Sequence, residues 1–118
     1  MPSKKTYNLK SAKFGPIEIP VNISDKEAFN EYAISIGEPV YGAFDAINGI
    51  QVNPDLPPSK KKVILMHEIL HAILDSLSVV LTDELEEQLV TDMAVLIVSL
   101  IQENPKLIGF ICDGEQSR

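Results

Sequence analysis

Apolar and polar residues alternate strictly in the first part of the chain. Every second residue from Ile17 to Ile23 is apolar, directly after Gly15-Pro16. This period of two predicts a β-strand that the chain enters through a turn. Because proline cannot donate a ladder hydrogen bond, Pro20 inside the run predicts that the strand lies at a sheet edge.

The next segment predicts a short helix over about residues 25–35. Ser24 can cap this helix, Glu27 can complete a capping box, and Gly37 and Pro39 stop it. A glycine after the last helical turn and a proline beyond it are typical of helix ends. We therefore expect one strand and one helix before residue 38.

Two short β-prone runs follow, Val40–Phe44 and Ile50–Val52. Asn48-Gly49 lies between them, and this pair is a strong signal for a tight hairpin turn. The pattern predicts two antiparallel strands.

The second half of the chain has the period of helices. One helix is predicted from Lys60 to about Leu77, with Ser59 as its cap, after the proline-rich segment 53–58. A second is predicted from Thr82 or Asp83 to Glu103. Residues 94–101 are apolar nearly all round, which predicts a central place in the core or a homodimer interface.

The end of the chain predicts little regular structure. Residues 107–111 suggest a short closing turn, and residues 113–118 suggest a frayed tail. The sequence as a whole therefore predicts an α+β fold, with a small, mostly antiparallel sheet packed on two long helices.

Composition excludes several classes of protein. A length of 118 residues, with 45% hydrophobic and 23% charged residues, is typical of one globular domain. The net charge of −7 repels phosphate backbones, so we expect no direct nucleic-acid partner. The apolar runs are too short for a membrane span and no signal peptide is evident, so a cytoplasmic location is expected. The single Cys112 excludes a thiolate-rich zinc site and an internal disulfide.

The two histidines of the chain form one motif, His67-Glu68-Ile69-Leu70-His71. On a helix, residues four apart project from one face about 6 Å apart along the axis, so both imidazoles can bind one tetrahedral ion. Glu68 is rotated about 100° from His67, which places it beside the metal as a general base for bound water. A histidine on an apolar helix is usually structural, but here the motif stands on a well-patterned helix and contains every histidine.

A catalytic zinc site needs a third protein ligand, and with no other histidine it must be a carboxylate. Asp75 lies on the same helix face but about 12 Å from His67 along the axis, so we interpret it as a hydrogen-bond partner of His71 or a solvated charge. The next helix offers Glu84, Glu86 and Glu87. Glu86 could instead close a capping box with Asp83, but periodicity alone leaves both Glu86 and Glu87 as candidates.

The runs 40–42, 50–52 and 65–74 resemble, in this order, the small phage-borne zinc metallopeptidases related to the ImmA/IrrE group. The resemblance covers about residues 38–108. In that group a glutamate opening an E-x-x-A-x-x-F-A helix is the third zinc ligand, and the segment from Glu87 to Ala94 is similar in spacing, with Val90 and Met93 as departures. The resemblance therefore implies Glu87 as third ligand.

The resemblance also implies a minimal zincin fold and a metallopeptidase, encoded by a phage or prophage, in a bacterial host. We expect one domain over residues 1–118, with an N-terminal extension (1–37), a core that matches the family (38–111) and a tail (112–118). Zn²⁺ would be held by His67, His71 and Glu87, with Glu68 as base. A peptide substrate would add as a strand beside the site at residues 50–52. Tyr41 is a further candidate, as an oxyanion donor.

Two other functions fit the sequence. The first is a non-catalytic, metal-stabilised phage regulatory or binding protein on the same scaffold, since 118 residues leave little material for a substrate cleft. The second is an acidic mimic of nucleic acid, which the −7 charge suggests. The mimic is the weaker alternative, because several carboxylates fall at helix starts and around the motif instead of in one acidic run.

Overall fold

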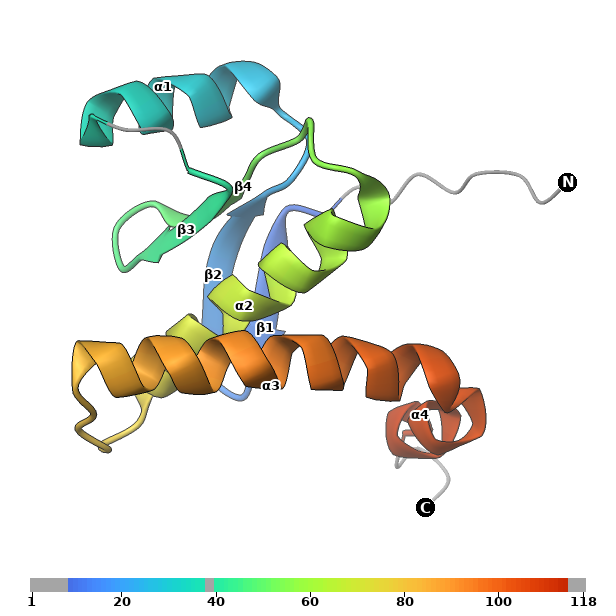
Figure 1. Cartoon of the computed structure of the whole chain (residues 1–118). Helices are drawn as coiled ribbons and strands as arrows, with labels where there is room; N and C mark the ends of the chain where they lie inside the picture. The colour runs from blue at the N-terminus through green and yellow to red at the C-terminus, as the bar shows by residue number, and fades with distance from the viewer. Residues whose placement is uncertain (1–8, 38–39, 115–118) are drawn as a thin grey trace, which may run out of the picture.

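The computed structural model describes residues 9–37 and 40–114 (Figure 1). Pro39, the first eight residues of the predicted extension and the last four residues of the predicted tail lie outside these ranges. The described residues form an α+β fold with a mixed four-stranded sheet and four helices. The elements in chain order are β1 (Ser11–Phe14), β2 (Ile17–Asn22), α1 (Lys26–Ile36), β3 (Gly42–Asp45), β4 (Gly49–Val52), α2 (Pro58–Ser76), α3 (Asp83–Glu103) and α4 (Pro105–Cys112).

The strand order in the sheet is β1-β2-β4-β3. β1 pairs with β2, and β3 with β4, in antiparallel register, whereas β2 and β4 are parallel. The sheet is therefore mixed, and the β1–β2 hairpin adds a strand that the alternation from Ile17 to Ile23 did not separate. Gly15 forms the turn of this hairpin with a φ of 60°, a conformation that glycine adopts at little cost.

The expectation that β2 lies at an edge is wrong. β2 has β1 on one side and β4 on the other. Pro20 pairs with Ser11, and the register with β4 starts at the next residue, where Val21 lies opposite Ile50. Proline is tolerated here because Pro20 comes before the residues that pair with β4.

Two helix starts differ from the expected caps, and the start of α3 agrees with one of its two expected positions. Asp25, not Ser24, caps α1 by accepting a hydrogen bond from the Ala28 amide. α2 begins at Pro58, since a proline at the first helical position needs no amide hydrogen bond, and Ser59 lies inside the helix. Thr82 caps α3 through the Leu85 amide at 3.1 Å.

The ends of the helices agree in part with expectation. α1 ends at Gly37, which adopts a left-handed φ of 84°, and α3 ends at Glu103 as predicted. The predicted closing turn is instead the eight-residue helix α4, which begins at Pro105.

The sheet packs against α2, and α3 packs against the other side of α2 (Figure 1). The first core joins four sheet residues to Ala72 of α2, and the second joins Leu70 of α2 to Val90 and Ala94 of α3. The expectation that the sheet packs on both long helices is therefore corrected, because α2 alone supplies the buried helix residue of the sheet core. The four sheet residues are Ile19, Val21, Ile50 and Val52.

Much of the apolar surface of α3 and α4 is exposed. Leu96 is 68% exposed and Phe110 80% exposed, although Ala94 is fully buried. A homodimer through this surface stays a prediction. Within the described ranges no single helix is long and apolar enough to span a membrane, and only α3 and α4 together reach that length and composition, across a bend of 92°.

Candidate metal centre

α2 presents two apolar faces and places the HExxH histidines between them. Ile69 and Ala72 face the sheet, whereas Met66 and Leu70 face α3. His67 and His71 are four residues apart, so they share one face, and their ring centroids are 4.9 Å apart. The packing of α2 on both sides thus directs both imidazoles to one place.

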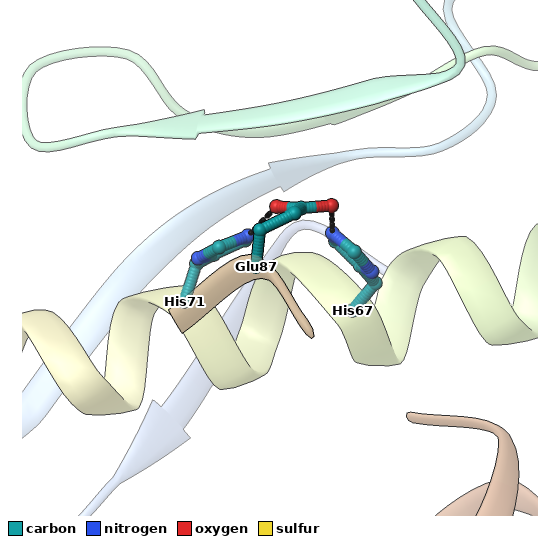
Figure 2. Close-up of side chains that lie close together, drawn as sticks. All are labelled: His67, His71 and Glu87. Carbon is teal, nitrogen blue, oxygen red and sulfur yellow. Dashed lines mark hydrogen bonds and ion pairs between the residues drawn. The ribbon is translucent and has the colours of Figure 1, made fainter. Parts of the chain in front are cut away.

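Glu87 comes to these histidines from the start of α3 (Figure 2). One carboxylate oxygen, Oε2, lies 3.2 Å from Nε2 of His67, and the other, Oε1, lies 3.0 Å from Nε2 of His71. Thr91, one turn further along α3, donates a hydrogen bond of 3.3 Å to Oε2. The structure therefore brings together the three residues that the resemblance implies as ligands, and among the described residues they form a group of potential ligands within 4.8 Å of one another.

This donor set fits a zinc ion. Imidazole nitrogens and a carboxylate oxygen are donors that zinc accepts. Here Glu87 contacts the two histidine nitrogens directly, at 3.2 and 3.0 Å, through its two different oxygens, so the three side chains meet at one place. Two histidines and one carboxylate are also a known catalytic donor set, which leaves a fourth position for water or substrate.

Glu86 is neither the third ligand of the cluster nor part of a capping box, the two roles considered for it from the sequence. Its Oε2 lies 2.7 Å from Nδ1 of His71. Since Thr82 caps α3, the third helical position is Leu85, so Glu86 closes no capping box. A carboxylate on Nδ1 fixes the tautomer of a histidine and directs Nε2 to the metal. Glu86 therefore orients His71.

Asp75 does not take the place suggested for it beside His71, since Glu86 occupies Nδ1 and Glu87 contacts Nε2. Asp75 is exposed, which agrees with the second interpretation, a solvated charge, and it lines the pocket beside the histidines. Choosing Thr82 over Asp83 as the cap would have excluded the capping-box role of Glu86 from the sequence, but its contact with His71 depends on how α2 and α3 pack.

Glu68 is the buried charged residue among those described, with 7% of its surface exposed. Burial raises the pKa of its carboxyl group to about 7, against the opposing charge of His71 and with support from Glu87. Glu68 is thus able to exchange a proton near neutral pH.

The two histidines have pKa shifts of opposite direction in the metal-free protein. Burial lowers the pKa of His67, although Glu87 partly opposes this effect. Burial also disfavours the charged form of His71, but hydrogen bonds to Glu86 and Glu87 outweigh it and raise the pKa of His71. Since a metal ligand must be a neutral imidazole, His71 would have to release its proton before it could bind a metal ion.

A pocket of about 760 Å³ opens beside the three ligand residues. Its wall on the sheet side runs from Val40 to Ala46 and includes all of β3, which is one of the two edge strands and, among the described strands, pairs only with β4. The expectation that a substrate strand adds at residues 50–52 is therefore wrong, because β4 has β2 and β3 on its two sides. The free hydrogen-bonding edge beside the site belongs to β3.

Gly42 lets β3 approach α2 closely. A Cβ atom at this position would lie 2.6 Å from Cγ2 of Ile64 and 3.0 Å from the carbonyl oxygen of Gln51. Gly42 also places β3 beside Glu68, whose Cγ would lie 3.5 Å from that Cβ atom. In the sequence, Gly42 appears in a β-prone run and in the run 40–42 of the resemblance, and neither indicates this close approach.

Tyr41 and Asp45 lie at opposite ends of β3 and both line the pocket. Tyr41 is 59% exposed, and Nζ of Lys60 lies 4.3 Å from its ring centroid, so the residue is at the surface and not in the core. Asp45 accepts hydrogen bonds from the amides of Ile47 and Asn48. The hydrogen bonds from Asn48 contribute most to lowering the pKa of Asp45. They favour the ionised form of Asp45 in the β3–β4 turn.

The chain matches no known family model, no curated protein and no solved structure. The relation to the ImmA/IrrE group therefore remains an expectation from the motifs. The function of this chain has to be inferred from the chemistry of the site.

Proposed function

We propose that this protein is a zinc-dependent metallopeptidase in which His67, His71 and Glu87 hold the ion and Glu68 is the general base. The proposal rests on one observation. Glu68, a residue that is 7% exposed, lines the same pocket as two histidines and a carboxylate whose potential ligand atoms lie within 4.8 Å of one another. Among the described residues no hydrogen bond or ion pair engages the Glu68 carboxylate, and neither of its oxygens is fully buried, so it opens into the pocket.

When bound, zinc supplies a Lewis acid that polarises the scissile carbonyl and lowers the pKa of a water molecule. Glu68 has a pKa of about 7, so at neutral pH it can accept a proton and later give it to the leaving amine. Glu86 keeps Nδ1 of His71 engaged, which holds Nε2 toward the ion. Tyr41, at the rim of the pocket, is the one described hydroxyl-bearing side chain in its lining and remains the candidate donor for the carbonyl oxygen.

The proposed substrate is a peptide in extended conformation, which adds its main chain to the free edge of β3. This strand lines the pocket along its full length. Main-chain pairing there would hold a peptide bond between the sheet and α2, beside the ligand cluster. The finer expectations, a minimal zincin fold and a relation to the ImmA/IrrE group, belong to this proposal.

The proposal is tested by metal content and hydrolysis together. Purified protein should contain about one zinc per chain by elemental analysis, and His71→Ala should lose it. Glu68→Gln should keep the zinc and lose hydrolysis of a peptide mixture followed by mass spectrometry. Glu84→Gln, an exposed change in the first turn of α3, is the matched control and should keep both.

Two results would contradict the proposal in different ways. Equal zinc in the wild type and in His71→Ala would exclude the metal site. Zinc that depends on His71, with no hydrolysis of any peptide by the wild type, would instead favour a metal-stabilised binding protein.

A further inference from the structure

The pocket beside the ligand cluster is strongly asymmetric in charge. Among the described residues that line it, five are carboxylates and none is a lysine or arginine. At one end the lining is apolar or aromatic and includes Val40, Tyr41 and Ile64. The carboxylates are Asp45, Glu68, Asp75, Glu86 and Glu87.

The two walls of the pocket run side by side in the same direction, from His67 toward His71 (Figure 2). Gly42, at the start of β3, is placed beside Glu68. From there β3 extends about 10 Å to Asp45, at about 3.3 Å per residue. α2 advances a similar distance, about 10 Å, from Glu68 to Asp75. Asp45 and Asp75 therefore lie toward the same end of the pocket.

Four of the five carboxylates already have partners or a role in the proposed site. Glu86 and Glu87 contact His71, Glu68 is the proposed base, and Asp45 is hydrogen-bonded within its turn. Asp75 is different, because no hydrogen bond or ion pair engages it within the described ranges. Even a bound dication would leave this end of the pocket negative.

We propose that the pocket selects an extended peptide with a lysine or arginine side chain near the bond to be cleaved, and that Asp75 is the residue that selects it. The inference rests on the proposed function. Asp75 lies one helical turn beyond His71, about 6 Å along α2. An extended peptide advances about 3.3 Å per residue, and alternate side chains point to the same face. The selected side chain therefore lies two residues from the carbonyl held at the ligand cluster.

A lysine or arginine at this position places a cation against Asp75 and Asp45, whereas a glutamate is repelled by both. Asp75 is solvent-exposed, so the attraction is modest and screened by salt. We expect a preference of about 1.5-fold to fivefold in kcat/KM for lysine over glutamine at low salt. The preference should fall as sodium chloride is added.

The experiment uses pairs of peptides that differ only by lysine or glutamine, two residues before or two residues after the cleaved bond. The zinc-loaded wild type should prefer lysine at one of the two positions. Asp75→Asn should reduce that ratio toward one, and Asp75→Lys should reduce it further. Asp92→Asn removes the same charge from an exposed position of α3 outside the pocket and should leave the ratio unchanged.

Failure of this inference can be distinguished from failure of the proposed function. Two zinc-loaded proteins are compared, the Glu68→Gln variant and the Glu68→Gln variant that also carries Asp75→Asn. Their binding of fluorescent lysine and glutamine peptides is measured by anisotropy, which requires no hydrolysis. Preference for lysine peptides that Asp75→Asn removes supports the inference even if the wild type cleaves nothing. A preference that Asp75→Asn leaves intact, equal binding of lysine and glutamine peptides, or no binding of either would overturn it.

Discussion

Replacing Glu68 by glutamine should stabilise the metal-free protein, and the gain should depend on pH. Glu68 is 7% exposed and its carboxyl pKa is raised to about 7, mainly by burial. Glutamine has nearly the same shape and carries no charge. The substitution therefore removes the cost of a buried carboxylate and leaves the packing of α2 unchanged.

The magnitude follows from the difference between the folded and unfolded pKa. Raising the pKa of this carboxyl group from 4.5 to about 7 corresponds to about 3 kcal/mol when the group is ionised. The folded state holds the proton more tightly, so the stability that protonated Glu68 provides is fully present below about pH 4.5. It is lost as the pH rises through about 7. Glu68→Gln should thus equal the wild type near pH 4.5 and exceed it by about 3 kcal/mol at pH 8.

The assay is urea unfolding followed by circular dichroism, in EDTA, at several pH values between 4.5 and 8. Because the charges of Glu68 and His71 act on each other, the comparison is also made in a His71→Ala background, where this coupling is absent. Glu84→Gln is exposed and should show a flat difference over the same range. A Glu68→Gln variant that is no more stable than the wild type at pH 8 would refute the buried, ionisable carboxylate on which the proposed base depends.

Two further predictions concern Glu86 and Gly42. Glu87→Gln should abolish stoichiometric zinc binding, whereas Glu86→Gln should weaken it about 10- to 100-fold; competition with a chelator measures both, and equal effects would contradict the separate roles. Gly42→Ala should cost about 1 to 3 kcal/mol because its Cβ would overlap Ile64, whereas Gly109→Ala has open space and should not destabilise. Urea unfolding compares them, and equal stability of the two variants would contradict the close approach of β3.

Local patterns were sufficient to predict most elements of this fold. The alternation from Ile17 to Ile23 and the turn signal at Asn48-Gly49 reflect local physics, and β2 and the β3–β4 hairpin lie where they predict. Strand order is a tertiary property. Pro20 suggested an edge, but β4 pairs beside it from the next residue, and no local pattern shows that β2 and β4 are parallel.

The residues of the candidate site also divide into those that local spacing predicts and those that tertiary packing places. The spacing of His67 and His71 on one helix determines that they share a face, so the HExxH motif was sufficient to predict that they lie together. The position of Glu87 depends on how α3 crosses α2, and the structure places it against both histidines. The contact of Glu86 with His71 and the role of β3 as the edge strand come from packing between elements that are distant in sequence.

The most direct test of the account is a crystal structure of the zinc-loaded protein, with the ion located by its anomalous scattering. The account predicts one ion bound by Nε2 of His67, Nε2 of His71 and a carboxylate oxygen of Glu87, with water in the fourth position and Glu68 beside that water. It also predicts that Nδ1 of His71 stays bonded to Glu86. A fourth protein ligand in place of water, Glu68 or Glu86 bound to the ion, or no ion at these residues would contradict it.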